Sequence, residues 1–260
     1  MRRLRNRRYR NPADPKVSHA QPPLHVNADT RGLGRWCACI LRGFSGPVAE
    51  LAATGLTVAC GGRMRNRGQV VAAGVSLGGN ALMRWAGEQG QEALKQVKAV
   101  ASICSPLDLA ASGKAIGEGF NRQVYTRMFL RSMKPKALAK LKQHPGLFDA
   151  QRMLDSKDLY EFDNVFTAPL HGFQNTDDYW RRASALPLMA NIQIPALALN
   201  ALNDPFIPAD SLPSTRIVSP CVELWQPPHG GHVGFAKGVM PGHLKAMPEA
   251  VGTWLIQHLS

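Results

Sequence analysis

The sequence of 260 residues predicts an α/β fold, a mostly parallel sheet with helices on both faces. Short apolar runs typical of buried strands alternate with longer segments that have the spacing of amphipathic helices. One run enters a glycine-bounded turn that leads directly into helix-forming residues, within residues 70–85. Hydrophobic residues make up 45% of the chain, which is enough for a sizeable core.

Five apolar runs are expected to form the strands of this sheet. They are Leu56–Cys60, Val70–Val75, and residues 97–104, 194–199 and 222–225. If the first two were adjacent parallel strands, a crossover of a dozen or more residues should join them, yet only residues 61–69 lie between them. Either these strands are not adjacent partners or a crossover helix is missing. The N-terminal half of the sheet is therefore expected to be shortened or irregular.

A helical insertion of about residues 108–185 is expected to form a lid over the active site. Residues 108–119 have the composition of a loop. Residues 121–133 and 136–143 have helical spacing of apolar residues and are separated by Pro135. After the last predicted strand, residues 243–259 are expected to form a terminal helix.

The turn within the central segment contains a G-x-S-x-G pentapeptide with Ser76 at its middle. A strained backbone at the serine requires positions without side chains two residues before and after it, which Gly74 and Gly78 provide. Such a turn raises the Ser76 hydroxyl above the end of the sheet. It also aims the Leu77 N–H at a developing oxyanion. The pentapeptide alone is a weak signal, since many turns without catalytic function contain the same residues.

Asp204 and His232 each follow the C-terminal end of a predicted strand, where open α/β sheets gather catalytic groups. The chain order Ser, Asp, His predicts a serine hydrolase in which His232 takes the proton of Ser76 and Asp204 holds the tautomer of His232. Alone, Asp204 could be a turn residue before Pro205 and His232 an ordinary loop histidine. His229 competes with His232 for the role of base. His229 and His232 could also suggest a pair of metal ligands. No acidic or thiol residue stands at metal-like spacing from these two histidines, so no metal is expected.

The formal net charge of +13 belongs mainly to the N-terminal part of the chain. Residues 1–70 hold 13 Lys and Arg against 3 acids, and residues 71–260 hold 18 against 15. Residues 1–36 are predicted to be a disordered basic tail, and residues 37–260 to form the catalytic domain. The tail could contact acidic surfaces weakly. Specific nucleic-acid binding is not expected, because Tyr9 is the one aromatic residue near its start.

A cytoplasmic location is expected. No apolar run approaches the ~18 residues of a membrane span, and no apolar stretch follows the first arginines as in a secretory signal. The cysteines are odd in number and scattered, as expected for free thiols in a reducing compartment. They are Cys37, Cys39, Cys60, Cys104 and Cys221.

From about residue 70 to residue 259, the chain resembles the YheT-like branch of the α/β-hydrolase superfamily. The resemblance is carried by Gly74-Val75-Ser76-Leu77-Gly78-Gly79-Asn80, Glu118-Gly119-Phe120-Asn121 with Val124-Tyr125, Asp163-Asn164-Val165-Phe166-Thr167-Ala168, His171-Gly172-Phe173, Asp178-Tyr179-Trp180, Asn203-Asp204-Pro205-Phe206 and His229-Gly230-Gly231-His232-Val233-Gly234-Phe235. It implies an α/β-hydrolase fold with a helical lid and a triad of Ser76, Asp204 and His232. It also implies carboxylic-ester hydrolase activity on a small-molecule or lipid ester, with no cofactor.

The N-terminal part departs from this family pattern. Relatives have a His-Gly-rich oxyanion loop, then a strand, an Arg-Gly-x-Ser-Gly motif and a helix before the serine turn. Residues 42–46 could correspond to either motif, and if they are the oxyanion loop, the Phe44 N–H is the second donor. Ester hydrolysis through an acyl-Ser76 intermediate is the predicted reaction. Acyl transfer on the same triad and a non-catalytic hydrolase-fold protein with a basic tail are the alternatives, and the oligomeric state is left open.

Overall fold

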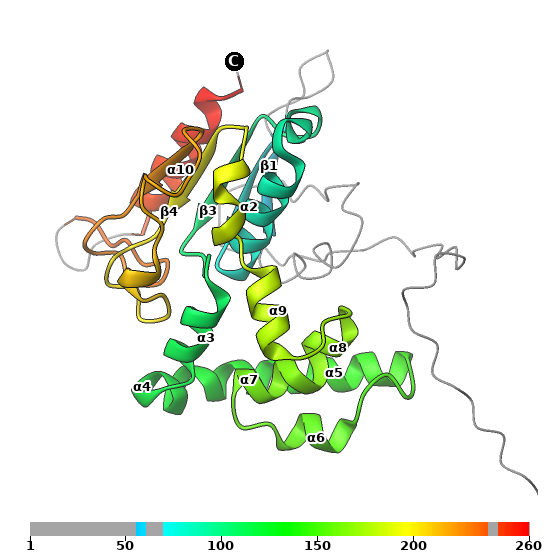
Figure 1. Cartoon of the computed structure of the whole chain (residues 1–260). Coiled ribbons are helices and arrows are strands. Elements are labelled where there is room, and N and C mark those ends of the chain that lie inside the picture. The colour runs from blue at the N-terminus through cyan, green and yellow to red at the C-terminus, as the bar shows by residue number, and fades with distance from the viewer. Residues whose placement is uncertain (1–55, 61–69, 239–243, 260) are drawn as a thin grey trace, which may run out of the picture.

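The computed structural model describes residues 56–60, 70–238 and 244–259 of the chain (Figure 1). Within these residues a five-stranded sheet has the order β1-β2-β3-β4-β5. The strands are β1 (Leu56–Cys60), β2 (Val70–Val75), β3 (Ala99–Ile103), β4 (Ala196–Leu199) and β5 (Val222–Trp225). Strands β2 to β5 pair in parallel. The prediction of a mostly parallel sheet is confirmed, and each strand lies within its predicted run.

Strand β1 pairs with β2 in the antiparallel direction, with Leu56 opposite Gly74 and Cys60 opposite Val70. The difficulty raised by a parallel pairing of these two strands therefore does not arise. Antiparallel neighbours need no crossover helix, so the nine residues 61–69 are enough to connect them. These nine residues lie outside the described part of the chain, as do the predicted tail of residues 1–36 and Phe44.

Helices cover both faces of the sheet, as predicted. On one face, α2 (Leu77–Gln89) and the 3-10 helix η5 (Leu186–Asn191) pack against alternate strand residues. On the other face, α10 (Ala246–Gln257) packs against the remaining strand residues, whose side chains point to the opposite side of the sheet. Ala72 and Val100 therefore belong to the first core, whereas Val71 and Ala101 belong to the second. The near-continuous apolar runs of the sequence follow from this burial of both faces.

The chain between β3 and β4 is largely helical and extends below the sheet in the view of Figure 1, on the side where β3 ends. Its elements are α3 (Leu109–Ile116), α4 (Gly119–Asn121), the π-helix η3 (Arg122–Thr126), α5 (Arg127–Gln143), α6 (Ala150–Asp155), α7 (Leu159–Phe162), the π-helix η4 (Asp163–Thr167), α8 (Ala168–Leu170) and α9 (Thr176–Ala183). The 3-10 helices η2 (Gly90–Lys95) and η6 (Ala209–Ser211) lie elsewhere in the described chain. No helix of the described residues is both long enough and apolar enough to span a membrane. The lid function of this insertion stays a prediction.

The prediction of a loop at residues 108–119 is wrong, because most of this segment forms helix α3. The carboxylate of Asp108 accepts hydrogen bonds from the N–H groups of Ala110 and Ala111, at 3.0 and 3.1 Å. This side chain caps the first turn of the helix and satisfies donors that have no intrahelical acceptor. An aspartate directly before a helix is a signal for its start, and Asp108 provides that signal in the sequence.

Pro135 does not separate two helices, as its position had suggested, because it lies inside α5. A proline in a helix removes one hydrogen bond and crowds the preceding turn, which costs about 3 kcal/mol or more in an isolated helix. Here Leu130 before the proline and Ala137 after it are both buried in one cluster with Met153 and Phe162. Packing on both sides of Pro135 therefore holds the two halves in one helix.

Candidate active site

Ser76 lies in the turn between β2 and α2, where its backbone has φ 53° and ψ −127°. A positive φ is unfavourable for a residue with a side chain, so the surrounding structure must hold it. The Ser76 N–H donates to the Ile103 carbonyl at 2.8 Å, which ties the turn to the end of β3. A Cβ added at Gly74 would lie 2.6 Å from the Gly78 carbonyl oxygen, so this close turn requires glycine there. The turn has the geometry that the pentapeptide predicted.

The Leu77 N–H lies at the start of α2, next to Ser76. The first intrahelical bonds of this helix run from the N–H groups of Gly79 and Asn80 to the Ser76 carbonyl, at 3.0 and 3.3 Å. The Leu77 N–H precedes them and has no acceptor within the helix, and the helix dipole makes this end electropositive. The geometry suits a donor to an oxyanion, a role that stays a prediction for Leu77 and for Phe44.

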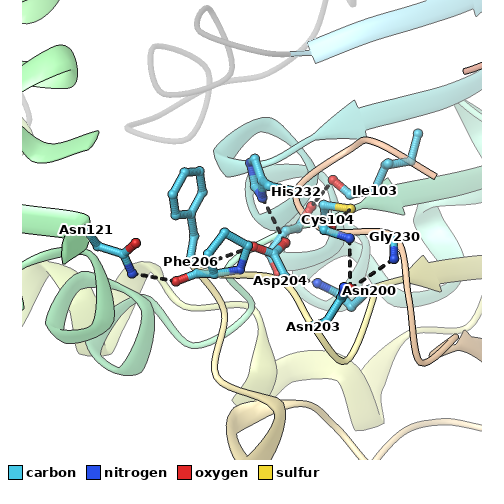
Figure 2. Close-up of polar contacts among 12 residues, drawn as sticks. Ile103, Cys104, Asn121, Asn200, Asn203, Asp204, Phe206, Gly230 and His232 are labelled. Carbon is cyan, nitrogen blue, oxygen red and sulfur yellow. Dashed lines mark hydrogen bonds and ion pairs between the residues drawn. The ribbon is translucent and has the colours of Figure 1, made fainter. Parts of the chain in front are cut away.

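Asp204 and His232 form a side-chain pair after the ends of β4 and β5 (Figure 2). The His232 Nδ1 lies 2.8 Å from the Asp204 Oδ2, and the Asp204 Oδ1 accepts a hydrogen bond from the Phe206 N–H at 2.9 Å. The Asp204 side chain is 0% exposed and that of His232 is 18% exposed. With Nδ1 held by the carboxylate, Nε2 is the ring atom left to exchange a proton with another group.

His229 lies in the same loop but is exposed, and no contact with Asp204 is among those described. Of the two histidines that compete for the role of base, the structure therefore brings His232 to the acid. Ser76, Asp204 and His232 follow parallel strands and stand at the same edge of the sheet. The described contacts include no hydrogen bond between the side chains of Ser76 and His232. In the described part of the chain no group of three or more potential ligands could hold a metal ion.

The loop that carries His232 is fastened by Asn203, a residue to which the sequence assigned no role in the site. The Asn203 Oδ1 accepts hydrogen bonds from the N–H groups of Gly230 and Gly231, at 2.9 and 2.8 Å. One amide oxygen thus joins the loop after β4 to the loop after β5. Asn203 stands directly before Asp204, so it fixes the separation of the acid and the histidine.

The insertion contacts Pro205 and Phe206, the two residues that follow Asp204. The His232 ring lies against the Phe206 ring, with centroids 4.6 Å apart, and Tyr125 of η3 meets Phe206 edge-on at the same centroid distance. The Asn121 side chain donates to the Pro205 carbonyl at 2.7 Å (Figure 2). Tyr125 and Asn121 stood in motifs of the resemblance, but no sequence pattern assigned them to this place. The insertion therefore packs on the residues next to Asp204 and reaches His232 through the Phe206 ring.

Cys104 lies between the serine turn and the histidine loop, at the end of β3. It is buried, has a φ of 48°, and its thiol lies 3.9 Å from the Gly231 carbonyl oxygen. Desolvation raises the pKa of this thiol to about 11. A thiol that stays protonated is a poor nucleophile, so Ser76 is the better candidate at this edge of the sheet.

Two known proteins are similar to this chain over about two thirds of its length or more. The Escherichia coli K12 protein YheT, whose name assigns it provisionally to the esterases, is 33% identical over 190 residues, which cover 72% of this chain and 55% of YheT. Human phospholipase ABHD3 is 30% identical over 176 residues, 66% of this chain and 42% of its own length. The chain is a YheT-like α/β-hydrolase. This confirms the resemblance found in the sequence.

The chain spans about half the length of these two relatives. Among solved structures, the monoacylglycerol lipase of Paleococcus ferrophilus is 19% identical, with a TM-score of 0.40 over 73% of this YheT-like chain and 69% of the lipase. No family model matches the sequence.

Proposed function

We propose that this YheT-like chain hydrolyses carboxylic esters through an acyl-Ser76 intermediate. The observation that carries the proposal is the pair of Asp204 and His232, 2.8 Å apart, at the sheet edge where Ser76 stands in a strained turn. Strain of this kind persists where the surrounding structure requires it, and it concentrates at functional sites. The names of the relatives, an esterase and a phospholipase, support the same reaction class.

The proposed acylation begins when the Ser76 Oγ attacks the carbonyl carbon of the ester. The hydroxyl proton passes to the His232 Nε2. The carbonyl oxygen becomes an oxyanion, which accepts a hydrogen bond from the Leu77 N–H. The C–O bond to the alcohol then breaks, and the alcohol leaves with the proton held by His232. Asp204 stays ionised and stabilises the imidazolium through Nδ1.

Deacylation repeats these steps with water as the nucleophile. His232 takes a proton from water as its oxygen attacks the acyl carbon, and the second oxyanion collapses as the Ser76 Oγ leaves with the proton of His232. The carboxylic acid is released and the serine is restored, so no cofactor is consumed. The substrate class is a small-molecule or lipid ester, since one named relative acts on phospholipids and the insertion packs beside the pair through apolar rings.

The proposal is tested with a fluorophosphonate probe, which labels activated serines. The parent protein should be labelled and should hydrolyse a short p-nitrophenyl ester, and Ser76→Ala should do neither. The matched control is Ser214→Ala, because Ser214 is exposed and far from this turn in the sequence. A folded parent that is not labelled, or a Ser76→Ala variant labelled as strongly as the parent, would contradict the proposal.

A further inference from the structure

The helical segment formed by α4, η3 and α5 carries an exposed apolar stripe. Phe120, Val124 and Met128 follow one another at intervals of four residues, and their exposed fractions are 70%, 42% and 54%. Side chains four apart lie on one side of a helix, so these three make a continuous ridge. Large apolar side chains that share one exposed ridge mark an interaction surface more often than scattered ones do.

A basic groove of about 610 Å³ runs along the same segment. Its cationic lining residues are Arg122, Arg127, Arg131, Lys134 and Lys157. Arg122 lies 3.7 Å from the carboxylate of Asp158, and Lys134 donates to the carbonyls of Leu154 and Ser156. The ion pairs described for the structure include neither Arg127 nor Arg131, and both side chains are exposed. Two guanidinium groups are therefore available to a ligand.

The apolar stripe and the free arginines are neighbours on the helix. Arg127 follows Val124 by three residues and Arg131 follows Met128 by three, the spacing at which side chains touch along a helix. A ridge of apolar side chains flanked by basic ones is the pattern of helices that lie in a membrane interface. The apolar groups enter the boundary of the acyl chains, while the cations bind lipid phosphates.

Another side of this segment contacts residues of the candidate active site. Asn121 is bonded to the Pro205 carbonyl and Tyr125 packs on Phe206, which itself packs on His232. Thr126, between the exposed positions, is fully buried. In Figure 1 the segment lies below the sheet, on the side where the strands leading to the site end. A membrane held by the outer side of the segment would be close to the site.

We infer that the segment of residues 119–143 docks the protein on an anionic lipid bilayer. Phe120, Val124 and Met128 enter the headgroup boundary, and Arg127 and Arg131 bind lipid phosphates. An anionic bilayer matches both the apolar ridge and the exposed arginines, because its acyl chains lie directly beneath a layer of negatively charged headgroups. The inference concerns binding, so it does not depend on the proposed hydrolysis.

The test measures binding of the full chain to vesicles of phosphatidylcholine with and without phosphatidylserine, by co-sedimentation at physiological ionic strength. The parent should bind the anionic vesicles, and Arg127→Gln with Arg131→Gln should bind at least about tenfold more weakly, since each basic residue near an anionic surface contributes several-fold. Val124→Ser with Met128→Ser should also bind more weakly, and its deficit should persist in high salt. Circular dichroism melting checks that each variant is folded.

The matched control removes two charges from the same helix, through Lys136→Gln with Lys140→Gln. These residues are about half a turn away from Arg127 and Arg131, so this variant should bind about as well as the parent. All variants share the basic N-terminal residues, so a contribution from those residues cancels in the comparison. Equal binding by the arginine and lysine variants, or no binding by the parent, would overturn the inference. Full displacement by inorganic phosphate would overturn it too, because the groove would then be a phosphate pocket.

Discussion

The side-chain nitrogen of Asn121 lies 2.7 Å from the carbonyl oxygen of Pro205 and donates a hydrogen bond to it. The same nitrogen also donates to the Ala115 carbonyl at 3.0 Å. One side chain thus joins the end of α3, the start of the next helical segment and the residue that follows Asp204. The insertion and the acid of the proposed triad are held in one arrangement by this amide.

We predict that Asn121→Ala lowers kcat on a soluble p-nitrophenyl ester by on the order of tenfold, because a small displacement of catalytic groups is costly. Gln123→Ala is the control, since Gln123 is exposed two residues away. Steady-state kinetics and a melting curve measure both variants. If both variants keep the turnover of the parent, the bond to Pro205 does not position the acid.

Ser76→Ala should reduce turnover of the same ester by on the order of 10⁴-fold or more, because the nucleophile of the proposed mechanism is lost. The melting temperature should not fall, since alanine keeps the Cβ and removes a group that is not needed for folding. Unchanged turnover in a folded variant would remove Ser76 from the mechanism.

His232→Ala should lose activity to the same extent as Ser76→Ala, whereas His229→Ala should retain most of it. The reason is geometric, because His232 is bonded to the buried carboxylate of Asp204 and His229 is exposed. The two variants are compared in one kinetic assay, so each is the control of the other. The opposite ranking would assign the base to His229.

Asn203→Ala should lower kcat, with a smaller effect on KM, because two N–H groups of the histidine loop lose their acceptor. Asn203→Asp keeps an oxygen at the same place and should recover part of the loss. Kinetics of both variants, together with circular dichroism, separate a positioning role from general instability. Equal losses in the two variants, with unchanged melting, would show that the acceptor oxygen is not what matters.

The stability of the insertion should depend on the charge of Asp163. Desolvation raises the pKa of this carboxyl to about 6 from an ordinary value of 3.8, although Thr167 and Trp180 donate hydrogen bonds to it. Between about pH 4 and pH 6 the folded protein then binds more protons than the unfolded chain, so the free energy of unfolding falls as pH rises through this window.

Asp163→Asn is neutral at every pH, and its amide can still accept from Trp180 and donate to Thr167. Relative to the parent, the variant should therefore gain stability above about pH 6 and show a flatter profile between about pH 4 and 6. Denaturant unfolding at several pH values measures this difference. A parent and a variant with parallel profiles would mean that Asp163 does not titrate in this window.

The sequence by itself determined the strands and the serine turn, because these depend on residues that are neighbours in the chain. The run Val70–Val75, which contains Gly74 and is followed by Ser76 and Gly78, has few conformations other than a strand and a tight turn. The cap of α3 by Asp108 belongs to the same class, since it involves residues two and three positions away.

The tertiary structure determined the strand pairing and the hydrogen bonds between residues that are far apart in the sequence. The sequence did not show that β1 is the neighbour of β2, because a short apolar run does not specify its partner strand; the nine-residue connection excluded only a parallel pairing. Asn203 finds its partners 27 and 28 residues away, and Asn121 meets Pro205 across 84 residues. An asparagine side chain in the sequence does not indicate its partner, since it can form hydrogen bonds with water or with any backbone group. The packing of the sheet and the insertion brings one particular partner within reach.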